Sequence, residues 1–403
     1  LRRRLSGEVG LHSPKRISPR RRKPKAVCNH DKHEKKRTRR VNPARQSPQD
    51  ARDDMPMTEN TTEAAGDRRK TPGTIMVLGA NAFSGQDFVD LLLGSTPHRV
   101  IGVSRSPERS DTFLSYRRRP ISDLTRYEYH QLDMNQDTDR LLALLDAAKP
   151  AYIVNFAAQS EVAPSWDHPE HWFNTNTVAL AKIVNHLRRQ DYLERYLHVS
   201  SPEAYGTCVG SVTEDAPLNP STPYAASKAA ADMLLKTYQK QFGFPLLTVR
   251  ATNVYGPGQQ LFKIIPRSAI YIRLKKTIRL HGGGHAVKSY IHIRDISRGE
   301  LAILQRGEIG ELYHLSPDAG IAVRDVVQMI CDAAGAPFES ATKMADERPG
   351  QDAAYVIDST KARTELAWSP QITLEDGLRE VVSWIDTYWN DIRRQPLEYL
   401  HRP

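Results

Sequence analysis

The sequence predicts an α/β fold, in which a doubly wound parallel sheet of about seven strands precedes a smaller C-terminal α/β domain. Short apolar runs alternate with helical stretches between residues 74 and 250, which is typical of βαβ units. These runs are mostly apolar rather than alternating, as strands that are covered on both faces require. Beyond residue 250 the rhythm breaks, and loops rich in glycine and proline mix with short strands and helices.

The apolar runs and the stretches between them place the individual elements. Six strands are expected, at residues 74–79, 99–104, 127–132, 151–156, 196–200 and 245–250. Helices are expected between them at residues 84–94, 137–148, 171–189 and 223–242. After residue 250 we expect three further helices, at residues 295–306, 323–335 and 374–390.

Residues 1–70 differ from the rest of the chain in charge. They carry 21 Lys and Arg against 9 Asp and Glu, and prolines interrupt their basic runs. The remaining residues carry 36 basic and 38 acidic side chains, so the net charge of +10 belongs to this segment. Because it has too few apolar residues to offset its ordering entropy, we expect a disordered basic tail. Nucleic-acid binding is not expected outside this tail.

Cysteine spacing and hydropathy narrow the class of protein. Cys28, Cys208 and Cys331 lie too far apart for a disulfide framework or a zinc pattern, which favours a reducing cytoplasm. The sequence has no run of about 18 apolar residues, so we expect no membrane span. Two groups resemble metal ligands only superficially, namely His281 with His285, and Cys28 with His30 and His33. We therefore predict no metal site.

A glycine-bounded turn joins the first strand to the first helix. Glycine permits the tight turn, and the start of the helix offers free N–H groups to a pyrophosphate. The spacing is not G-x-G-x-x-G, because Ala82 stands in the middle place, and no Gly-Lys-Ser/Thr follows as in a P-loop. A purely structural turn remains an alternative. We predict a dinucleotide site here, formed by Gly79, Asn81, Ala82, Phe83, Ser84 and Gly85.

The residues after the second and third strands bear on the choice of cofactor. An acidic residue after the second strand would bind the ribose of NAD, whereas Arg105, which follows Ser104, suits a 2′-phosphate. We therefore expect NADP, with NAD as the alternative, because Arg105 could equally be a surface residue of an arginine-rich loop. Asp133, followed by Met134, could accept a hydrogen bond from adenine, although a simple loop aspartate fits almost as well.

Tyr224 and Lys228 lie four residues apart and so share one face of the helix 223–242. A lysine there would lower the pKa of the phenol and hold the nicotinamide ribose, so that Tyr224 acts as a base near neutral pH. An exposed amphipathic pair is the alternative. Ser201 makes the pattern more specific, because a hydroxyl at the carboxyl end of a parallel strand lies on the ligand side of the sheet.

Together these residues and the segment Asn155-Phe-Ala-Ala-Gln159 resemble the extended short-chain dehydrogenases/reductases with their Rossmann-type fold, over residues 74–390. Within that superfamily the chain is similar to the nucleotide-sugar 4,6-dehydratases of the dTDP-glucose and GDP-mannose kinds. Three segments carry this closer resemblance: Val199-Ser-Ser-Pro-Glu-Ala-Tyr-Gly206, Asn253-Val-Tyr-Gly-Pro-Gly258 and Glu347-Arg-Pro-Gly350. Epimerases of the same fold generally lack an acid corresponding to Glu203, which makes Glu203 the discriminating residue.

The resemblance implies a mechanism without net redox change. Tyr224 takes the proton of the sugar 4-hydroxyl while a hydride leaves C4, and Ser201 binds the same oxygen. The 4-ketone acidifies the C5 hydrogen, Glu203 removes it, water leaves from C6 and the hydride returns there. Pro202 stands where the dTDP-glucose branch has an acid, so we expect Glu203 to deliver its proton to the C6 oxygen.

The resemblance also implies binding residues and partners. Cofactor contacts are expected from Phe156, Ala157, Ala158 and Gln159, in addition to Tyr224 and Lys228. Substrate contacts are expected from Ser160, Ser165, Asn253, Arg267, Lys288 and Arg348. Residues 72–252 should form the NAD(P)-binding domain and residues 253–395 mainly the substrate domain, with some return to the sheet. We expect a homodimer or homotetramer that acts on a nucleotide-diphosphate sugar. A 4-epimerase or decarboxylase, or a non-catalytic NAD(P)-binding protein, are the alternatives.

Overall fold

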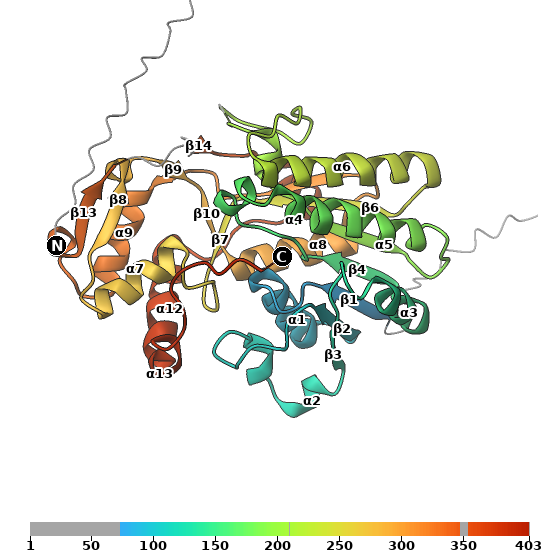
Figure 1. Ribbon diagram of the computed structural model, residues 1–403, viewed down its shortest axis with the longest axis horizontal. Coiled ribbons are helices and arrows are strands. Elements are labelled where there is room, and N and C mark those ends of the chain that lie inside the picture. Colours follow the sequence, from blue (N-terminus) through green and yellow to red (C-terminus); the bar gives the residue numbers. More distant parts are fainter. Residues whose placement is uncertain (1–72, 209, 347–353, 403) are drawn as a thin grey trace, which may run out of the picture. The chain divides into compact units, whose positions relative to one another are not determined.

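A parallel sheet of seven strands lies at the centre of the structure, a computed structural model that describes residues 73–208, 210–346 and 354–402 (Figure 1). Its strand order is β11-β6-β5-β4-β1-β2-β3, and every neighbouring pair is parallel. The strands are β1 (Thr74–Leu78), β2 (Arg99–Ser104), β3 (Tyr127–Gln131), β4 (Tyr152–Asn155), β5 (Arg195–Val199), β6 (Leu246–Ala251) and β11 (Leu312–Leu315). This order confirms the predicted doubly wound fold.

Helices cover both faces of the sheet, because successive side chains of each strand point to opposite sides. In β1, Ile75 and Val77 pack into one core cluster, whereas Met76 and Leu78 pack into the other. The first cluster includes helices α1 (Phe83–Ser95), α8 (Ile293–Arg306) and α11 (Thr360–Leu366). The second includes α3 (Thr138–Ala148), α5 (Leu180–Leu187) and α6 (Pro223–Phe242), and α5 and α6 lie side by side in Figure 1.

The chain order reverses at the middle of the sheet. From β1 the chain runs outward through β2 to β3, and then returns to β4 on the other side of β1. The segments that follow β1 and β4 therefore leave the sheet in opposite directions. Open α/β sheets bind ligands in the crevice that forms at such a point, outside the carboxyl ends of the strands. The strand β11 adds the outer edge next to β6, although it lies far along the chain from the other strands.

The helix that the sequence predicts at residues 171–189 is interrupted. It consists of α4 (Pro169–Phe173), a π-helical stretch η4 (Asn174–Ala179) and α5. A π-helical turn has i→i+5 hydrogen bonds instead of the i→i+4 bonds of an α-helix, and it occurs frequently at functional sites. Here it carries Thr175 and Asn176, which contact the loops at the centre of the sheet.

The residues after β6 form small sheets and a helical cluster. β7 (Asn253–Tyr255) pairs with β10 (Tyr290–His292), β9 (Val287–Lys288) lies between β12 (Ile321–Ala322) and β14 (Ala354–Tyr355), and β8 (Ile278–His281) pairs with β13 (Thr342–Ala345). Helices α7 (Ile264–Arg273), α9 (Val323–Ala333) and α12 (Leu374–Thr387) share an apolar core. The helix expected at residues 374–390 ends at Thr387, and α13 (Trp389–Ile392) follows it.

Short helices complete the described chain: α2 (Ile121–Leu124), α10 (Phe338–Ala341), η2 (Ser115–Arg118), η3 (Ala163–Trp166), η5 (Pro202–Tyr205) and η6 (Gly282–Gly284). All described residues belong to one unit, Asp67–Pro403, and the boundary near residue 252 stays a prediction. The tail 1–70 and Arg348 lie outside the described residues. None of the described helices is both long enough and apolar enough to cross a bilayer.

Candidate active site

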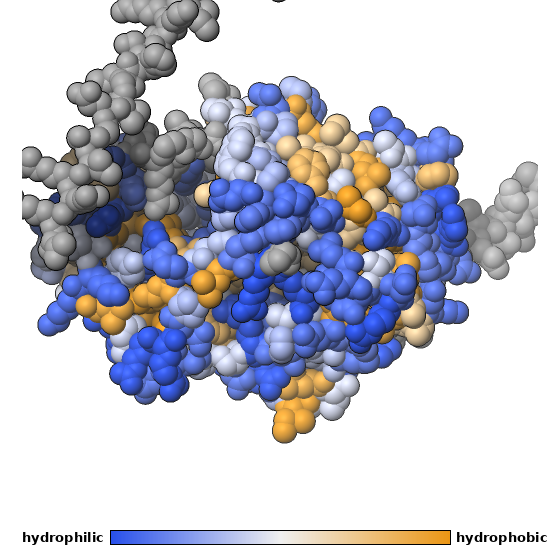
Figure 2. Space-filling view, in the orientation of Figure 1, coloured by the Kyte–Doolittle hydropathy of each residue, from blue (hydrophilic) through white to orange (hydrophobic). Residues whose placement is uncertain are grey.

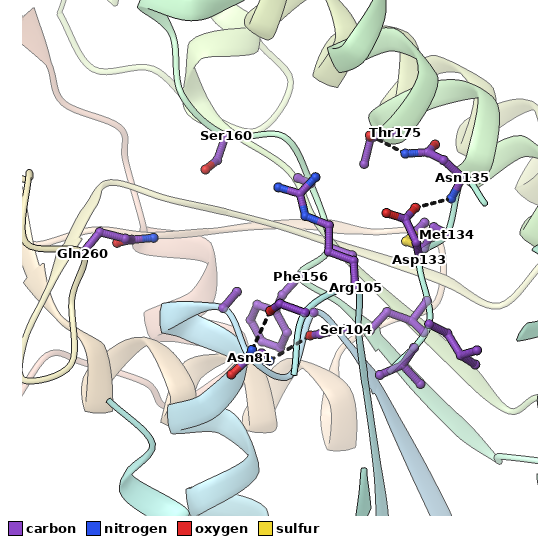
Figure 3. A pocket seen from close by; sticks show the side chains of 18 residues that line it. Asn81, Ser104, Arg105, Asp133, Met134, Asn135, Phe156, Ser160, Thr175 and Gln260 are labelled. Carbon is purple, nitrogen blue, oxygen red and sulfur yellow. Dashed lines mark hydrogen bonds between the residues drawn. The ribbon is translucent and has the colours of Figure 1, made fainter. Parts of the chain in front are cut away.

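A cleft opens at the reversal point of the sheet, and we call it the switch-point cleft (Figure 3). The loops that follow β1, β2, β3 and β4 form its walls. Its lining residues are Leu78, Gly79, Asn81, Ala82, Val103, Ser104, Arg105, Ser106, Leu132, Asp133, Met134, Asn135, Phe156, Ala157, Ala158, Ser160, Thr175 and Gln260. The structure thus brings together most of the residues that the sequence assigned to the cofactor.

The two glycines that bound the first turn are required by close backbone contacts. Gly79 has a φ of +85°, and a Cβ atom there would lie 2.7 Å from the backbone nitrogen of Ala157. A Cβ atom on Gly85 would lie 2.2 Å from the carbonyl oxygen of Gly79. The N-cap of α1 is Ala82, which has no side-chain capping bond, so N–H groups at the start of this helix are available to an anionic ligand.

Asn81 holds the turn against the loop after β2. Its backbone N–H donates to Ser104 Oγ at 2.9 Å, and its side-chain amide donates to Ser106 Oγ and to the carbonyl oxygen of Pro107, each at 2.7 Å. The side-chain oxygen of Asn81, Oδ1, accepts from the backbone N–H of Arg109 at 3.1 Å. The Asn81 side chain and the Ser104 hydroxyl therefore fix the cleft wall, while both residues also line it.

Arg105 is the cation of the switch-point cleft. Its side chain extends across the cleft toward Ser160 in Figure 3, and its Nη1 donates to the carbonyl oxygen of Arg402 at 3.1 Å. Asp133 is the only carboxylate among the lining residues, and it lies after β3 rather than after β2. Asp133 Oδ1 accepts from the backbone N–H of Asn135, whose amide donates to Thr175 Oγ1 (Figure 3).

The loop after β4 forms the opposite wall. Phe156, Ala157 and Ala158 line the switch-point cleft, as expected. Gln159 instead lines a second cavity, which adjoins the cleft because both share Arg105, Ala158, Ser160 and Gln260 as lining residues. Gln159 is buried, and its amide donates to the carbonyl oxygen of Arg402 at 2.6 Å. Phe83, Ser84 and Gly85 are not among the residues that line the switch-point cleft. They form the first turn of α1, whose N–H groups are available to an anionic ligand.

Ser201, Glu203 and Tyr224 meet at the end of β5. Ser201 is the N-cap of η5, and its hydroxyl accepts from the backbone N–H of Glu203. Pro202 occupies the first position of η5, where its fixed φ suits a helical turn. Burial and the negative charge of Glu203 raise the pKa of the Tyr224 phenol above its usual range, and a hydrogen bond with Ser201 opposes this effect. The carboxylate and the hydroxyl therefore both act on the phenol.

Lys228 lies one turn after Tyr224 on α6 and is buried. Its ammonium donates to the carbonyl oxygen of Val199 at 2.7 Å. Burial lowers its pKa to about 8, although Asp232 opposes the shift and Arg250 adds to it. That Lys228 lowers the pKa of the Tyr224 phenol stays a prediction, because the effects resolved on that pKa come from burial, from neighbouring carboxylates and from Ser201.

A buried polar network lies behind Lys228. Asp232, one further turn along α6, accepts from Arg250 Nη2 and from Ser200 Oγ, each at 2.6 Å. The Arg250 guanidinium also lies over the ring of Tyr205, 4.2 Å from its centroid. This network fixes α6 against β5 and β6, and so holds Lys228 in place.

A family comparison agrees with this geometry. Residues 76–381 match the model of the family described as GDP-mannose 4,6 dehydratase. The chain belongs to this family. A dTDP-glucose 4,6-dehydratase from Streptomyces niveus is 32% identical over 77% of this chain and 92% of its own length. The low-salt glycan biosynthesis protein Agl12 from Haloferax volcanii is 30% identical over 77% of this chain and 97% of its own length.

Solved structures agree with this dehydratase family. The dTDP-glucose 4,6-dehydratase DesIV from Streptomyces venezuelae, with NAD and TYD bound, has a TM-score of 0.71 and 29% identity, covering 81% of this chain and 100% of its own. A UDP-glucuronic acid 4-epimerase from Bacillus cereus has a TM-score of 0.69 at 24% identity, covering 78% of this chain and 99% of its own, which shows the shared fold alone. The chain is an enzyme of the nucleotide-sugar 4,6-dehydratase class, as its sequence predicts.

The residues expected to bind substrate in this dehydratase lie in several places. Ser160 lines the switch-point cleft and the adjoining cavity. Ser165 is buried, and its hydroxyl accepts from the backbone N–H of Tyr224 at 3.2 Å, so it positions the start of α6. The Asn253 amide donates to the carbonyl oxygen of Ser289. Lys288 lies in β9, and Arg267 lines a separate cavity with Lys276 and Arg279.

Several contributors to the site were not predicted from the sequence, and four of them are polar residues outside the loops after β1 and β2. Asn135, Thr175 and Gln260 line the switch-point cleft, and Asn176 accepts from the backbone N–H of Gln159 at 2.9 Å. Asn135 could have been found, because it lies two residues after Asp133 in the same loop. Thr175 and Asn176 could not, since their positions depend on the π-helical turn.

Proposed function

We propose that this enzyme converts a nucleotide-diphosphate sugar into its 4-keto-6-deoxy derivative. The observation that carries the proposal is the meeting of Ser201, Glu203 and Tyr224, one helical turn from the buried Lys228. The residues of the switch-point cleft fit a nicotinamide dinucleotide, because an uncapped helix start, a cation and a carboxylate line one crevice. When bound, this cofactor accepts a hydride from C4 and later returns it to C6.

Each protein group then has a proton-handling task. Tyr224 Oη takes the proton of the sugar 4-hydroxyl, and the Ser201 hydroxyl orients the same sugar oxygen. Lys228 favours the phenolate form in which Tyr224 acts as a base, since its ammonium lies on the same helix face one turn away. Glu203 takes the C5 proton, which the neighbouring 4-ketone has made acidic.

Loss of water requires a proton donor at the C6 oxygen. Pro202 has neither a side-chain acid nor an N–H to offer. We propose that Glu203 passes the C5 proton to the C6 oxygen, so that the C6–O bond breaks and water leaves. Glu203 is thereby restored to a carboxylate before the hydride reaches C6, and C5 then gains a proton, which balances the one that Tyr224 took from the 4-hydroxyl.

The test compares Glu203→Gln with Glu161→Gln on the intact protein. Glu161 is a matched control, since its charge also raises the pKa of Tyr224 but its carboxylate pairs with Lys263 at 2.7 Å. Products are followed by mass, and cofactor reduction is followed by absorbance. Glu203→Gln should permit C4 oxidation and stop water loss, while Glu161→Gln turns over. Normal dehydration by Glu203→Gln would refute the proposal.

The substrate is to be sought in a panel of nucleotide sugars. We propose dTDP-glucose and GDP-mannose first, because the relatives and the family description name these compounds, followed by UDP-N-acetylglucosamine and CDP-glucose. Loss of one water from any of them supports the assignment. A product inverted at C4 with no loss of water would identify a 4-epimerase instead.

We further propose NADP as the preferred cofactor. The support is the side chain of Arg105, which reaches across the cleft, and the absence of a carboxylate after β2 among the lining residues. A charge-assisted bond to a 2′-phosphate contributes about 1.5–3 kcal/mol, which is roughly 10- to 150-fold in Kd. Arg105→Ser should weaken NADP binding by this factor and leave NAD binding nearly unchanged. Equal loss for both cofactors would contradict the preference.

We also propose that two copies pair through α4, η4 and α6, as a dimer or as half of a tetramer. Exposed apolar side chains gather on these elements, and Figure 2 shows apolar surface over α6: Phe173, Val178, Met233 and Phe242. Met233→Glu should lower the mass measured by light scattering. Ile121→Glu, at an equally apolar exposed position on α2, is the control. A monomeric parent protein would contradict the proposal.

Buried free thiols at Cys208 and Cys331 support a cytoplasmic location.

A further inference from the structure

The chain after α13 returns toward α4 (Figure 1), and residues between 395 and 402 line the cavity that adjoins the switch-point cleft. The carbonyl oxygen of Arg402 accepts from Gln159 at 2.6 Å and from Arg105 at 3.1 Å. The ring of His401 stacks on Trp172 with 5.1 Å between centroids. Residues 395–402, which we call the C-terminal strap, therefore contact two residues that the sequence assigned to the cofactor.

Beside the strap lie His168, Glu170 and His171, at the start of α4, which we call the histidine cluster. One carboxylate oxygen of Glu170 lies 3.6 Å from His171 Nε2 and 3.9 Å from His168 Nδ1. The three ligand atoms all lie within 4.8 Å of one another. Ligand atoms of a tetrahedral zinc ion, with bonds of about 2.1 Å, are roughly 3.4 Å apart. Small rotations of these partly exposed side chains would give that geometry.

Two other partly exposed histidine–carboxylate pairs of this protein are closer, whereas the buried histidines His198, His292 and His314 lie 3.4–3.9 Å from their carboxylates, as in the histidine cluster. His186 Nε2 lies 2.7 Å from Asp146, and His130 Nε2 lies 2.6 Å from Glu128, so each ring is directly hydrogen-bonded to its carboxylate. In the histidine cluster both rings stand beyond hydrogen-bonding distance from Glu170, at the separation that ligands of one ion have.

His401 supplies the outer support that a metal-ligating histidine needs. His171 Nδ1 and His401 Nε2 share a hydrogen bond of 2.8 Å, and His401 Nδ1 lies 3.1 Å from Tyr399 Oη. A metal on His171 Nε2 leaves the proton on Nδ1, which then donates to His401 Nε2. Because His401 Nε2 then accepts a hydrogen bond, the ring proton of His401 lies on Nδ1, which faces Tyr399 Oη. Such outer partners fix the tautomer and orientation of ligating histidines.

We propose that His168, Glu170 and His171 bind one divalent transition-metal ion, and that this ion fastens the C-terminal strap beside the switch-point cleft through His401. Two imidazoles and a carboxylate suit zinc or cobalt, and leave a fourth position for water. These residues belong to neither of the two groups whose spacing superficially resembles a metal site in the sequence. The inference is independent of the proposed dehydration, because its readouts are metal binding and strap protection.

The first test titrates untagged full-length protein with Co²⁺ and follows the visible d–d absorption of a tetrahedral site, with Zn²⁺ as competitor. The parent should show one such site. His168→Ala, Glu170→Gln and His171→Ala should abolish the signal. His401→Phe, which keeps an aromatic ring against Trp172, should weaken binding about 10- to 100-fold. His186→Ala is the control and should leave the signal unchanged.

The second test measures hydrogen exchange in residues 395–402 with and without Zn²⁺. The metal should slow exchange in the parent and in His186→Ala, but not in His171→Ala or His401→Phe. Two results would overturn the proposal: a cobalt signal that survives both His168→Ala and His171→Ala, or strap exchange that does not respond to Zn²⁺ in the parent.

Discussion

Alanine at Gly79 should damage both the fold and cofactor binding. A left-handed alanine costs about 1–2 kcal/mol. Its Cβ atom would also lie 2.7 Å from the nitrogen of Ala157 and 2.9 Å from the carbonyl carbon of Phe156, and these backbone atoms cannot rotate away. Overpacking of this kind adds about 1–3 kcal/mol, so Gly79→Ala should lower the free energy of unfolding by roughly 2–5 kcal/mol.

Gly243→Ala is the matched control for the steric part of this cost. Gly243 ends α6 with a φ of +64°, and a Cβ atom there would meet nothing within 4 Å. Its expected cost is therefore only the left-handed term of about 1–2 kcal/mol. Denaturant unfolding measures both variants, and fluorescence titration measures the Kd for NAD and NADP. We expect at least a roughly tenfold weaker Kd in Gly79→Ala alone. Equal destabilisation with unchanged Kd values would refute the argument.

Three further predictions concern buried polar groups. Burial raises the pKa of Asp87 from 3.8 to about 6, so stability falls as pH rises from about 4 to 6. Asp87→Asn should therefore add up to about 3 kcal/mol of unfolding free energy at pH 8 and little at pH 4. The Lys228 ammonium titrates near pH 8, so kcat/KM should fall above that pH, and Lys228→Arg should remove this alkaline limb. Ser165→Ala leaves the backbone N–H of Tyr224 without its partner, which should cost about 1–3 kcal/mol and lower kcat more than cofactor affinity.

Each of these three has an outcome that would contradict it. A constant stability difference between Asp87→Asn and the parent from pH 4 to 8 would show that Asp87 does not titrate as described. An alkaline limb that persists unchanged in Lys228→Arg would assign it to another group. Ser165→Ala with parental kcat would show that the start of α6 does not need this contact.

The parallel strands were predictable because their physical signal is local. A strand that is covered on both faces must be apolar throughout, so the runs at residues 74–79 and 99–104 could be read without the rest of the chain. The loops that follow such strands were predictable as ligand contacts for the same reason, since parallel strands end at one edge of the sheet. Gly79, Asp133 and Phe156 all line the switch-point cleft accordingly.

The features that escaped prediction depend on tertiary context. Pro266 lies in the first turn of α7, where it is tolerated, but it obscures the helical pattern of that segment. The π-helical turn at Asn174–Ala179 leaves no distinct hydrophobic period. The histidine cluster gains its support from His401, which lies 230 residues away from His171 in the sequence.

The late strand β11 makes the sheet depend on chain that emerges long after its neighbours. Leu312–Leu315 supplies the hydrogen bonds along the outer edge of β6, and α8 covers the apolar side of α1, with Ser297 Oγ donating to Asp87. During vectorial synthesis a nascent chain that stops at residue 252 would present a bare strand edge and an uncovered helix, both of which invite aggregation. A fragment cut at that boundary is therefore a poor unit for expression. The sheet of the nucleotide-binding half can be completed only after residue 315 has left the ribosome.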